Sequence, residues 1–288
     1  MTNDSIEFSH RKFSINCQGE LIDLTTPQIM GILNLTPDSF SDGGKYNTVE
    51  AALRQTEKLI SDGATIIDIG PQSTRLGAEK LSAQEEIKRI GNIIGQIKRE
   101  FPGVLVSVDT FWAETVKACF NEGVDIINDI SAGQFDPEMF KAAGETRLPY
   151  ILMHVNPTYE SMHEKVDFDS ICVKVNKFLF EKAKELENLG INDIILDPGF
   201  GFGKSISDQQ ELIQQVQHIG FGKYPTLIGI SRKSFIYKPL NKGPLEINQE
   251  TQKLHRLVLE QGAKILRVHD AKMAKQTLDQ FLLDYPIN

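Results

Sequence analysis

Several short apolar runs in this sequence are followed by polar side chains of types that bind ligands. The carboxylates and amides among them can pair with the edge of a planar nitrogen heterocycle, and the cationic ones can hold an anion such as pyrophosphate. These residues are Asn34, Asp68, Asp109, Asn128, Asp197, Lys233, Arg267 and His269. Any one of them alone could equally be a helix cap or a satisfied core group. Polar residues at the ends of seven strands are hard to explain as caps, so they indicate a binding site.

The most informative stretch is residues 194–204, which read IILDPGFGFGK. Apolar residues lead into Asp197, and three glycines interleaved with two phenylalanines follow. A buried strand that ends on a carboxylate presents a ligand-binding group at the edge of an α/β sheet. Residues 203–205 also match the second half of a phosphate-binding P-loop, but Pro198 stands where that motif needs a glycine. The stretch therefore favours recognition of a flat ring.

Short β-branched runs alternate with longer helical patterns along the whole chain. Eight such pairs are typical of a (β/α)8 TIM barrel, an α/β fold whose strands are covered on both faces and whose active site lies at the C-terminal strand ends. An open doubly wound sheet would alternate too, but the first strand lacks a dinucleotide fingerprint. The expected strands are 29–35, 65–70, 104–110, 125–131, 150–155, 193–198, 226–231 and 264–269, and the expected helices are 48–62, 82–100, 112–122, 136–145, 166–189, 207–217, 249–261 and 271–284.

The N-terminal segment does not belong to this alternation. We expect residues 1–28 to form an extension and residues 29–288 to form the barrel. Two short strand-like runs, 13–17 and 21–24, flank Gln18-Gly19 and predict a β-hairpin. We expect this hairpin to close the bottom of the barrel, away from the chemistry.

Composition narrows the class of protein. With 40% hydrophobic and 24% charged residues in 288, the chain is typical of soluble globular proteins. No apolar run is long enough to span a bilayer, the first residues do not form a signal peptide, and three scattered cysteines lack metal-binding spacing, so a cytoplasmic protein is expected. A net charge of −8 argues against nucleic acid as a partner and requires a local basic cluster for any anionic substrate.

Seven segments, in order, resemble the signatures of the dihydropteroate synthase family. Enzymes of this family join a pterin pyrophosphate to para-aminobenzoate in folate biosynthesis, on a pterin-binding TIM barrel. The resemblance extends from Met30 to the last helix. The segments are MGILNLTPDSFSDGG (30–44), GATIIDIG (63–70), VDT (108–110), NDI (128–130), DPGFGFGK (197–204), SRKSF (231–235) and RVHD (267–270).

The resemblance implies a pterin site at the strand ends. Asp197 would accept hydrogen bonds from the 2-amino and N3 groups of the pterin. The backbone of Met153 and the rings around Phe202 would shape the slot. The residues that would grip the pterin are Asp109, Asn128, Asp197 and Lys233.

The resemblance also implies how pyrophosphate leaves. Asn34 would hold a Mg²⁺ ion that bridges the leaving pyrophosphate, a role that suits a hard cation shared with substrate phosphates. Arg267 and His269 would bind the same oxygens. No enzyme nucleophile is needed, because departure of pyrophosphate can run ahead of attack by the arylamine. Asp42 on the first loop is a candidate to stabilise the developing cation.

The second substrate would lie beside the first. Ser234, near the start of a helix, would receive the carboxylate of para-aminobenzoate. Phe40, Thr74 and Arg75 lie on loops that would close around it. The family further implies a homodimer that uses these two small molecules, without nucleic acid or membrane.

Two loops depart from the family pattern. Where the family usually reads GESTRPG, this chain has Pro71, Gln72 and Leu76 in place of glycine, glutamate and proline, and residues 154–159 lack the usual glycine. Two alternatives stay open. A corrinoid-dependent methyltransferase shares the pterin-binding barrel, but the basic segments 231–234 and 267–269 fit it less well. A non-catalytic pterin-binding paralogue would explain the altered loop.

Overall fold

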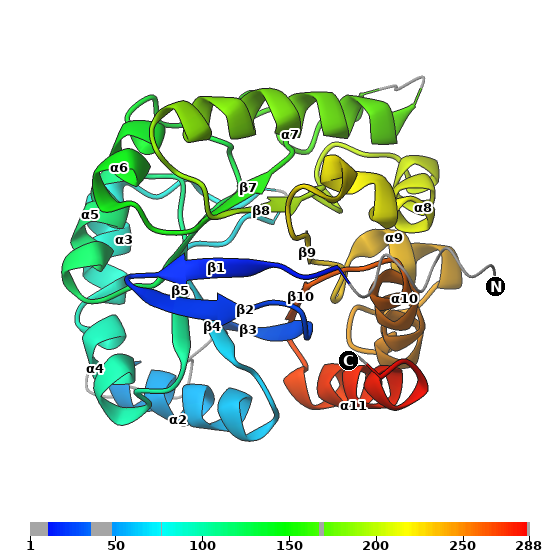
Figure 1. Cartoon of the computed structure of the whole chain (residues 1–288), viewed down its shortest axis with the longest axis horizontal. Coiled ribbons are helices and arrows are strands. Elements are labelled where there is room, and N and C mark those ends of the chain that lie inside the picture. Colours follow the sequence, from blue (N-terminus) through cyan, green and yellow to red (C-terminus); the bar gives the residue numbers. More distant parts are fainter. Residues whose placement is uncertain (1–10, 36–47, 76, 167–169, 287–288) are drawn as a thin grey trace.

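The computed structural model describes residues 11–35, 48–75, 77–166 and 170–286. Within them, eight parallel strands form one sheet in the order β8-β7-β6-β5-β4-β3-β10-β9. The two outermost strands of that order meet, because the backbone N–H of Leu196 donates to Pro225 O at 2.9 Å and Leu196 bridges Thr226. The sheet thus curls into a barrel, and helices surround it (Figure 1).

The elements agree closely with the alternation in the sequence. The strands are β3 (Gln28–Asn34), β4 (Ile66–Gly70), β5 (Leu105–Asp109), β6 (Ile126–Asp129), β7 (Tyr150–Met153), β8 (Ile194–Asp197), β9 (Leu227–Ile228) and β10 (Ile265–Val268). The helices are α2 (Thr48–Ser61), α3 (Ala83–Ile90), α4 (Ile93–Glu100), α5 (Ala113–Asn121), α6 (Met139–Thr146), α7 (Ile171–Asn188), α8 (Ile206–Gln214), α9 (Ser234–Tyr237), α10 (Asn248–Glu260) and α11 (Ala271–Asp284), with 3-10 turns η2 (Val216–Gly222) and η3 (Lys238–Leu240).

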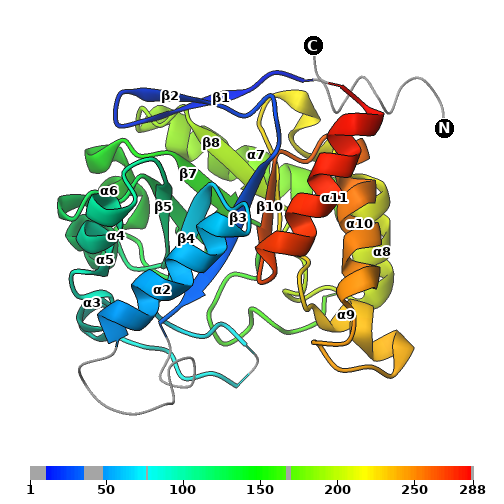
Figure 2. The ribbon, with the colours of Figure 1, turned by 90° about the horizontal axis from the view of Figure 1, so that it is seen from below.

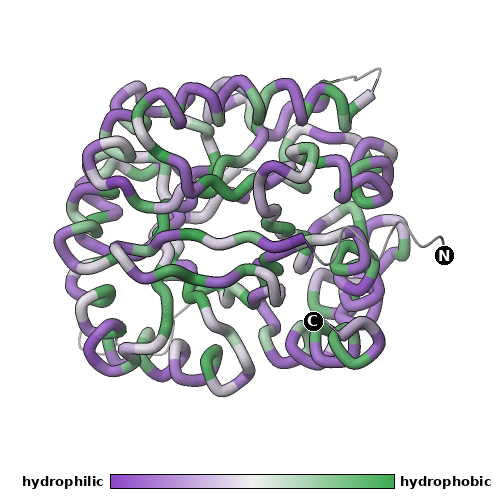
Figure 3. The backbone as a smooth tube through the Cα atoms, viewed as in Figure 1, coloured by the Kyte–Doolittle hydropathy of each residue, from purple (hydrophilic) through white to green (hydrophobic). Residues whose placement is uncertain are grey.

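The outer helices are amphipathic. Hydrophobic and hydrophilic residues alternate along these helices, as Figure 3 shows. One face of each helix packs on the barrel, and the opposite face is exposed to solvent. In α7, for example, Val175, Leu179 and Leu186 are fully buried. No helix in the described part of the chain is long and apolar enough to cross a membrane.

The predicted hairpin is present and closes one end of the barrel. Strands β1 (Ser14–Cys17) and β2 (Glu20–Asp23) pair antiparallel around Gln18-Gly19. Buried Ile15, Cys17 and Leu24 pack with the first residues of several barrel strands, among them Ile66 and Ile126. Figure 2 shows the hairpin lying across this N-terminal end. The boundary between an extension at 1–28 and a barrel at 29–288 stays a prediction.

Three local expectations need correction. The helix expected over 82–100 is two helices, because Gly91 ends α3 with a φ of +52°, which continues no right-handed helix. The strand expected over 226–231 ends at Ile228, since the backbone turns there and Lys233 N donates to Ile230 O at 3.2 Å. Helix α9 and η3 are missing from the expected elements, although a helix start near Ser234 was expected, because elements of four and three residues carry no periodic signal.

The hairpin yields a test of its structural role. We expect Ile15→Ala to lower the free energy of unfolding by about 2–5 kcal/mol, because the side chain is 1% exposed within this cluster. Denaturant unfolding would measure the loss. Leu21→Ala, on the same hairpin but 71% exposed, is the matched control and should change stability by less than about 0.5 kcal/mol. Equal losses in the two variants would contradict the packing role.

Candidate active site

The C-terminal ends of the strands bring the polar residues together. Asp109 is the last residue of β5 and stands beside Asn128 of β6 in the sheet register. Met153 and Asp197 end β7 and β8 and are register partners in the same way. The strand ends therefore place the predicted pterin residues on one rim, at the end of the barrel opposite the hairpin (Figure 2).

Arg267 of β10 lies at the centre of this rim. Its Nε donates to Asp68 Oδ2 and its Nη2 donates to Asp109 Oδ2, both at 2.6 Å. Asn128 Nδ2 donates to the same Asp68 oxygen at 3.1 Å. These contacts use two of the five N–H donors of the guanidinium. One cation therefore holds two carboxylates from β4 and β5 and leaves donors for an anionic ligand.

The electrostatics of this cluster follow from burial. Burial raises the pKa of Asp109, and the charge of Arg267 opposes that shift. Burial alone would lower the pKa of Arg267, but Asp68 and Asp109 outweigh it and raise the pKa above its ordinary value. Asp68 is fully buried, and its Oδ1 has no hydrogen-bond partner within the described residues. The sequence placed Asp68 at a strand end without giving it a role, because nothing local indicated its contact with Arg267.

Asp197 is held by the glycine-rich loop that follows it. Gly199 N donates to Asp197 Oδ1 at 2.7 Å, and the second carboxylate oxygen has no such bond within the described residues. Burial raises the pKa of this carboxyl, and the Gly199 bond and the charge of Lys233 oppose that shift. Gly199 has a φ of +71°, and a Cβ there would lie 2.0 Å from His154 O, so a larger residue cannot fit.

Lys204 holds the same loop through hydrogen bonds to its backbone. Its buried ammonium donates to Gly199 O at 2.8 Å and to Phe202 O at 3.1 Å. Burial lowers the pKa of Lys204 to about 7. The lysine of the segment that resembled half of a P-loop thus binds backbone carbonyls, which agrees with the rejection of a phosphate-binding loop. Sequence reasoning assigned no role to this lysine.

Lys233 and Phe202 meet at the rim. Lys233 Nζ lies 4.6 Å from the centroid of the Phe202 ring, a cation–π contact. A Cβ on Gly201 would come within 2.9 Å of Lys233 Cδ, so the glycine makes room for the lysine. Burial lowers the pKa of Lys233 to about 8, and the charge of Arg267 acts in the same direction. Met153 packs in the same apolar cluster as Phe202.

His269 follows β10 and contacts Ser231, in the segment after β9. Its Nδ1 lies 3.0 Å from Ser231 Oγ, and its backbone N donates to that oxygen at 3.3 Å. Burial, with the charges of Arg232 and Arg267, lowers the pKa of His269 to about 3. The ring is therefore neutral near pH 7. Because Ser231 Oγ accepts from the backbone N–H, its own proton is available to Nδ1, which favours a proton on Nε2 for an outside acceptor.

The structure describes some of the residues that were expected around the second substrate. Thr74 and Arg75 lie in the loop after β4, where Thr74 is half-buried and Arg75 is exposed. Ser234 is the first residue of α9, directly after Lys233. Phe40 and Asp42 fall outside the described residues.

Asn34 provides a candidate magnesium ligand. Gly70 is its register partner, and a Cβ there would lie 3.3 Å from Asn34 Oδ1 and 4.0 Å from Asp109 Oδ2. Both oxygens thus lie close to Gly70, and Mg²⁺ usually takes only one or two protein ligands besides substrate phosphates. In the described part of the chain, no three His, Cys, Asp or Glu side chains gather into a self-contained metal site.

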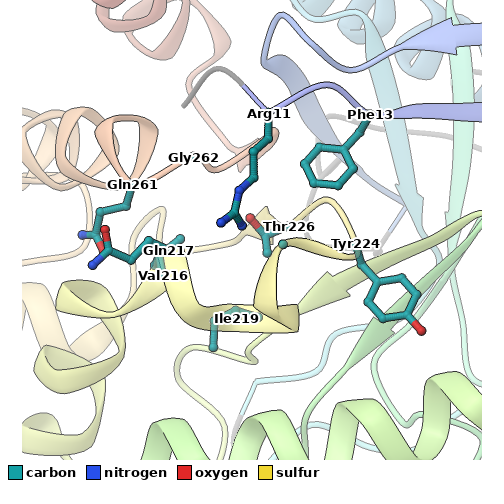
Figure 4. A pocket seen from close by; sticks show the side chains of 10 residues that line it. Arg11, Phe13, Val216, Gln217, Ile219, Tyr224, Thr226, Gln261 and Gly262 are labelled. Atoms are coloured by element: carbon teal, nitrogen blue, oxygen red, sulfur yellow. The ribbon is translucent and has the colours of Figure 1, made fainter. Parts of the chain in front are cut away.

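A small pocket lies at the other end of the molecule (Figure 4). Arg11, Tyr224, Thr226 and Gly262 are among the residues that line it. Thr226 and Gly262 precede β9 and β10, so the pocket lies at the N-terminal ends of the strands. In this fold that end serves stability rather than chemistry. The chemistry therefore belongs to the rim around Arg267.

Comparison with known proteins identifies the family. A family model described as pterin binding enzyme matches residues 30–269. Dihydropteroate synthase of Escherichia coli K12 is 40% identical over 257 residues, which are 88% of this chain and 90% of that protein. The chain belongs to the dihydropteroate synthase family. The sequence-based expectation of this family, its fold and its transferase class is confirmed.

Solved structures of the family agree. Dihydropteroate synthase of Xanthomonas albilineans with 4-aminobenzoic acid has a TM-score of 0.87 and 34% identity, covering 96% of this chain and 99% of that one. The same organism's enzyme in complex with 7,8-dihydropteroate has a TM-score of 0.85 and 32% identity, covering 96% and 100%.

The altered loop of this dihydropteroate synthase family member has a physical basis. Gln72 is buried, and its Nε2 donates to Glu86 Oε1 at 2.5 Å, while Leu81 N donates to Gln72 Oε1 at 3.3 Å. Thr110 Oγ1 donates to the other oxygen of Glu86 at 2.5 Å. Burial raises the pKa of Glu86 to about 7. A glutamine at 72 thus supplies the donor that this buried carboxyl needs, and a glutamate would not. Leu76 lies outside the described residues.

This pairing gives a prediction. We expect Gln72→Glu to lower the free energy of unfolding by about 1–3 kcal/mol at pH 8. The new side chain offers Glu86 no N–H donor and places a second buried carboxyl beside it. The loss should shrink toward pH 5. Burial raises the pKa of these carboxyls, so the folded variant binds more protons than the unfolded variant and its stability falls as pH rises. Denaturant unfolding at both pH values would measure the effect.

Gln84→Glu is the matched control. The Gln84 amide also donates to a carboxylate, Glu114 Oε2 at 2.8 Å, but on the exposed face of α3. That change should cost less than about 0.5 kcal/mol. A Gln72→Glu protein as stable as this control at pH 8 would contradict the role given to Glu86.

Proposed function

We propose that this protein condenses 6-hydroxymethyl-7,8-dihydropterin pyrophosphate with para-aminobenzoate to give 7,8-dihydropteroate and pyrophosphate, a step of folate biosynthesis. The observation that carries the proposal is the convergence of Asp109, Asn128 and Asp197 at one barrel rim, in a chain that matches the pterin binding enzyme family over residues 30–269. The E. coli relative of that name aligns over 88% of the chain.

The pterin ring is recognised by groups of fixed position. Asp197 presents one carboxylate oxygen toward the 2-amino and N3 protons, while its other oxygen is bound by Gly199. One N–H of the Asn128 amide donates to Asp68, so its other N–H and its carbonyl oxygen are left for the ligand. The ring of Phe202 and the buried side chain of Met153 bound the slot from the apolar side.

The reaction needs positioned charge rather than a nucleophile on the enzyme. The bond between C9 of the pterin and the pyrophosphate oxygen breaks, and its electron pair leaves with pyrophosphate. The amine of para-aminobenzoate forms the new bond to C9 and loses a proton. Arg267 offers its remaining N–H donors and His269 its Nε2 proton to the departing oxygens. Preorganised donors of this kind stabilise the developing charge.

Mg²⁺ fits beside these groups. Asn34 Oδ1 would hold the ion, with the Asp109 carboxylate at the end of a neighbouring part of the same rim, because Mg²⁺ prefers amide and carboxylate oxygens as protein ligands. When bound, the ion neutralises negative charge on the pyrophosphate. Arg267 keeps Asp109 in place for this role through its ion pair.

The second substrate completes the site. Thr74 and Arg75 enclose para-aminobenzoate, with Phe40 from the first loop, and Ser234 receives its carboxylate beside Lys233. Asp42 stabilises positive charge at C9. A homodimer, which the family resemblance implies, and a cytoplasmic location, which the composition predicts, complete the proposal.

Turnover and one substitution test the function. The purified protein with Mg²⁺ should convert both substrates to 7,8-dihydropteroate and pyrophosphate in equal amounts. We expect Asp197→Asn to weaken pterin binding, measured by calorimetry, by at least about tenfold, because charge-assisted hydrogen bonds contribute roughly 1.5–3 kcal/mol each. The asparagine keeps the acceptor for Gly199, so the fold should persist.

Asp193→Asn is the matched control. Asp193 precedes the same strand at its other end, where its carboxylate accepts from Asn16 N at 2.9 Å. Its replacement should leave pterin affinity unchanged. Unchanged affinity in Asp197→Asn would place the pterin elsewhere. Pterin binding without turnover would favour the non-catalytic alternative, and methyl transfer from a reduced folate would favour the corrinoid-dependent one.

A further inference from the structure

His163 connects two loops of the active site. It lies between β7 and α7, in a segment for which the sequence predicted no function. Its Nε2 is 2.8 Å from the backbone oxygen of Thr74, in the loop after β4. Because a carbonyl can only accept, the proton of this bond belongs to Nε2. The histidine thus holds the loop that carries Thr74 and Arg75 by its backbone.

The same ring packs on the pterin slot. His163 stacks on Phe202 with ring centroids 5.3 Å apart and planes 13° from parallel. Phe202 also contacts the ammonium of Lys233. A continuous chain of contacts therefore joins Thr74 to Lys233 through His163 and Phe202.

Other contacts hold the loop after β4 farther from the slot. Tyr159 Oη donates to Ala78 O at 3.2 Å, and Lys80 Nζ lies 5.4 Å from the centroid of the Tyr159 ring. Trp112 Nε1 donates to Leu81 O at 2.9 Å. These contacts hold the end of the loop next to α3, and Glu86 and Arg89 hold its start at Gln72 and Pro71. The bond from His163 holds the middle of the loop at Thr74.

We propose that His163 is a positioning residue for the second substrate. It fixes the Thr74 loop against the Phe202 ring, so that the surface enclosing para-aminobenzoate is aligned with the pterin slot. This inference rests on the proposed function, because it takes the two substrates from there. His163 acts through Thr74 and Phe202 and touches neither substrate.

Two substitutions separate its two contacts. His163→Phe keeps a ring on Phe202 and loses the donor to Thr74. His163→Gln keeps an amide donor for Thr74 and loses the ring. We expect His163→Phe to raise KM for para-aminobenzoate about five- to tenfold, with the Kd for the pterin pyrophosphate and kcat both within about twofold of wild type. His163→Gln should raise the Kd for the pterin pyrophosphate instead.

His218→Phe is the control, since that histidine is exposed in η2; it should alter none of these values. A KM for para-aminobenzoate in His163→Phe within twofold of wild type would overturn the proposal. So would equal changes of KM, Kd and kcat in both His163 variants, because a general loss of packing would produce them.

Hydrogen exchange decides the point without turnover. Amides of residues 73–75 should exchange several-fold faster in His163→Phe than in wild type and in the His218→Phe control, whereas amides of residues 77–81, which other contacts hold, should change little. Unchanged exchange would overturn the positioning role even if the enzyme is active. Faster exchange in a protein that fails to join the two substrates would sustain the loop contact and refute the proposed reaction.

Discussion

The guanidinium of Arg267 between Asp68 and Asp109 is the interaction on which the rest of the site depends. Two carboxylates on adjacent strands repel each other, and burial makes each costly to keep charged. The planar, always charged guanidinium donates to both carboxylates at 2.6 Å. The same contact orients Asn128 through Asp68 and keeps Asp109 near Asn34. Heterocycle recognition and anion binding thus share one framework.

Backbone geometry supplies the other half of the site. The glycine-rich loop after β8 approaches His154 and Lys233 too closely for larger residues, and buried Lys204 binds its carbonyls. A loop held in this way presents Asp197 at a fixed angle. Such rigidity matters because the proposed reaction relies on positioned charge rather than on a covalent intermediate. The side chains of Gln72 and His163 fit the same logic, since Gln72 donates to Glu86 of α3 and His163 donates to Thr74 of another loop.

The sequence predicted the barrel because its strands and helices carry strong local periodicity. It also placed Asp109, Asn128 and Asp197 at the active rim, since parallel strand ends share one edge. It did not reveal the split after Ile90, where one glycine ends the helix, or the partners of Asp68, Lys204 and His163. Those contacts join residues distant along the chain, and no local pattern encodes which side chains meet across a barrel.

The stability of an Arg267→Met protein tests the central claim most directly. Removal of the guanidinium leaves two buried carboxylates unpaired, so the free energy of unfolding at pH 8 should fall by about 3–5 kcal/mol. Adding Asp68→Asn and Asp109→Asn removes those charges and should restore most of the loss. An Arg267→Met protein as stable as wild type, or a triple variant no more stable than the single one, would contradict the account.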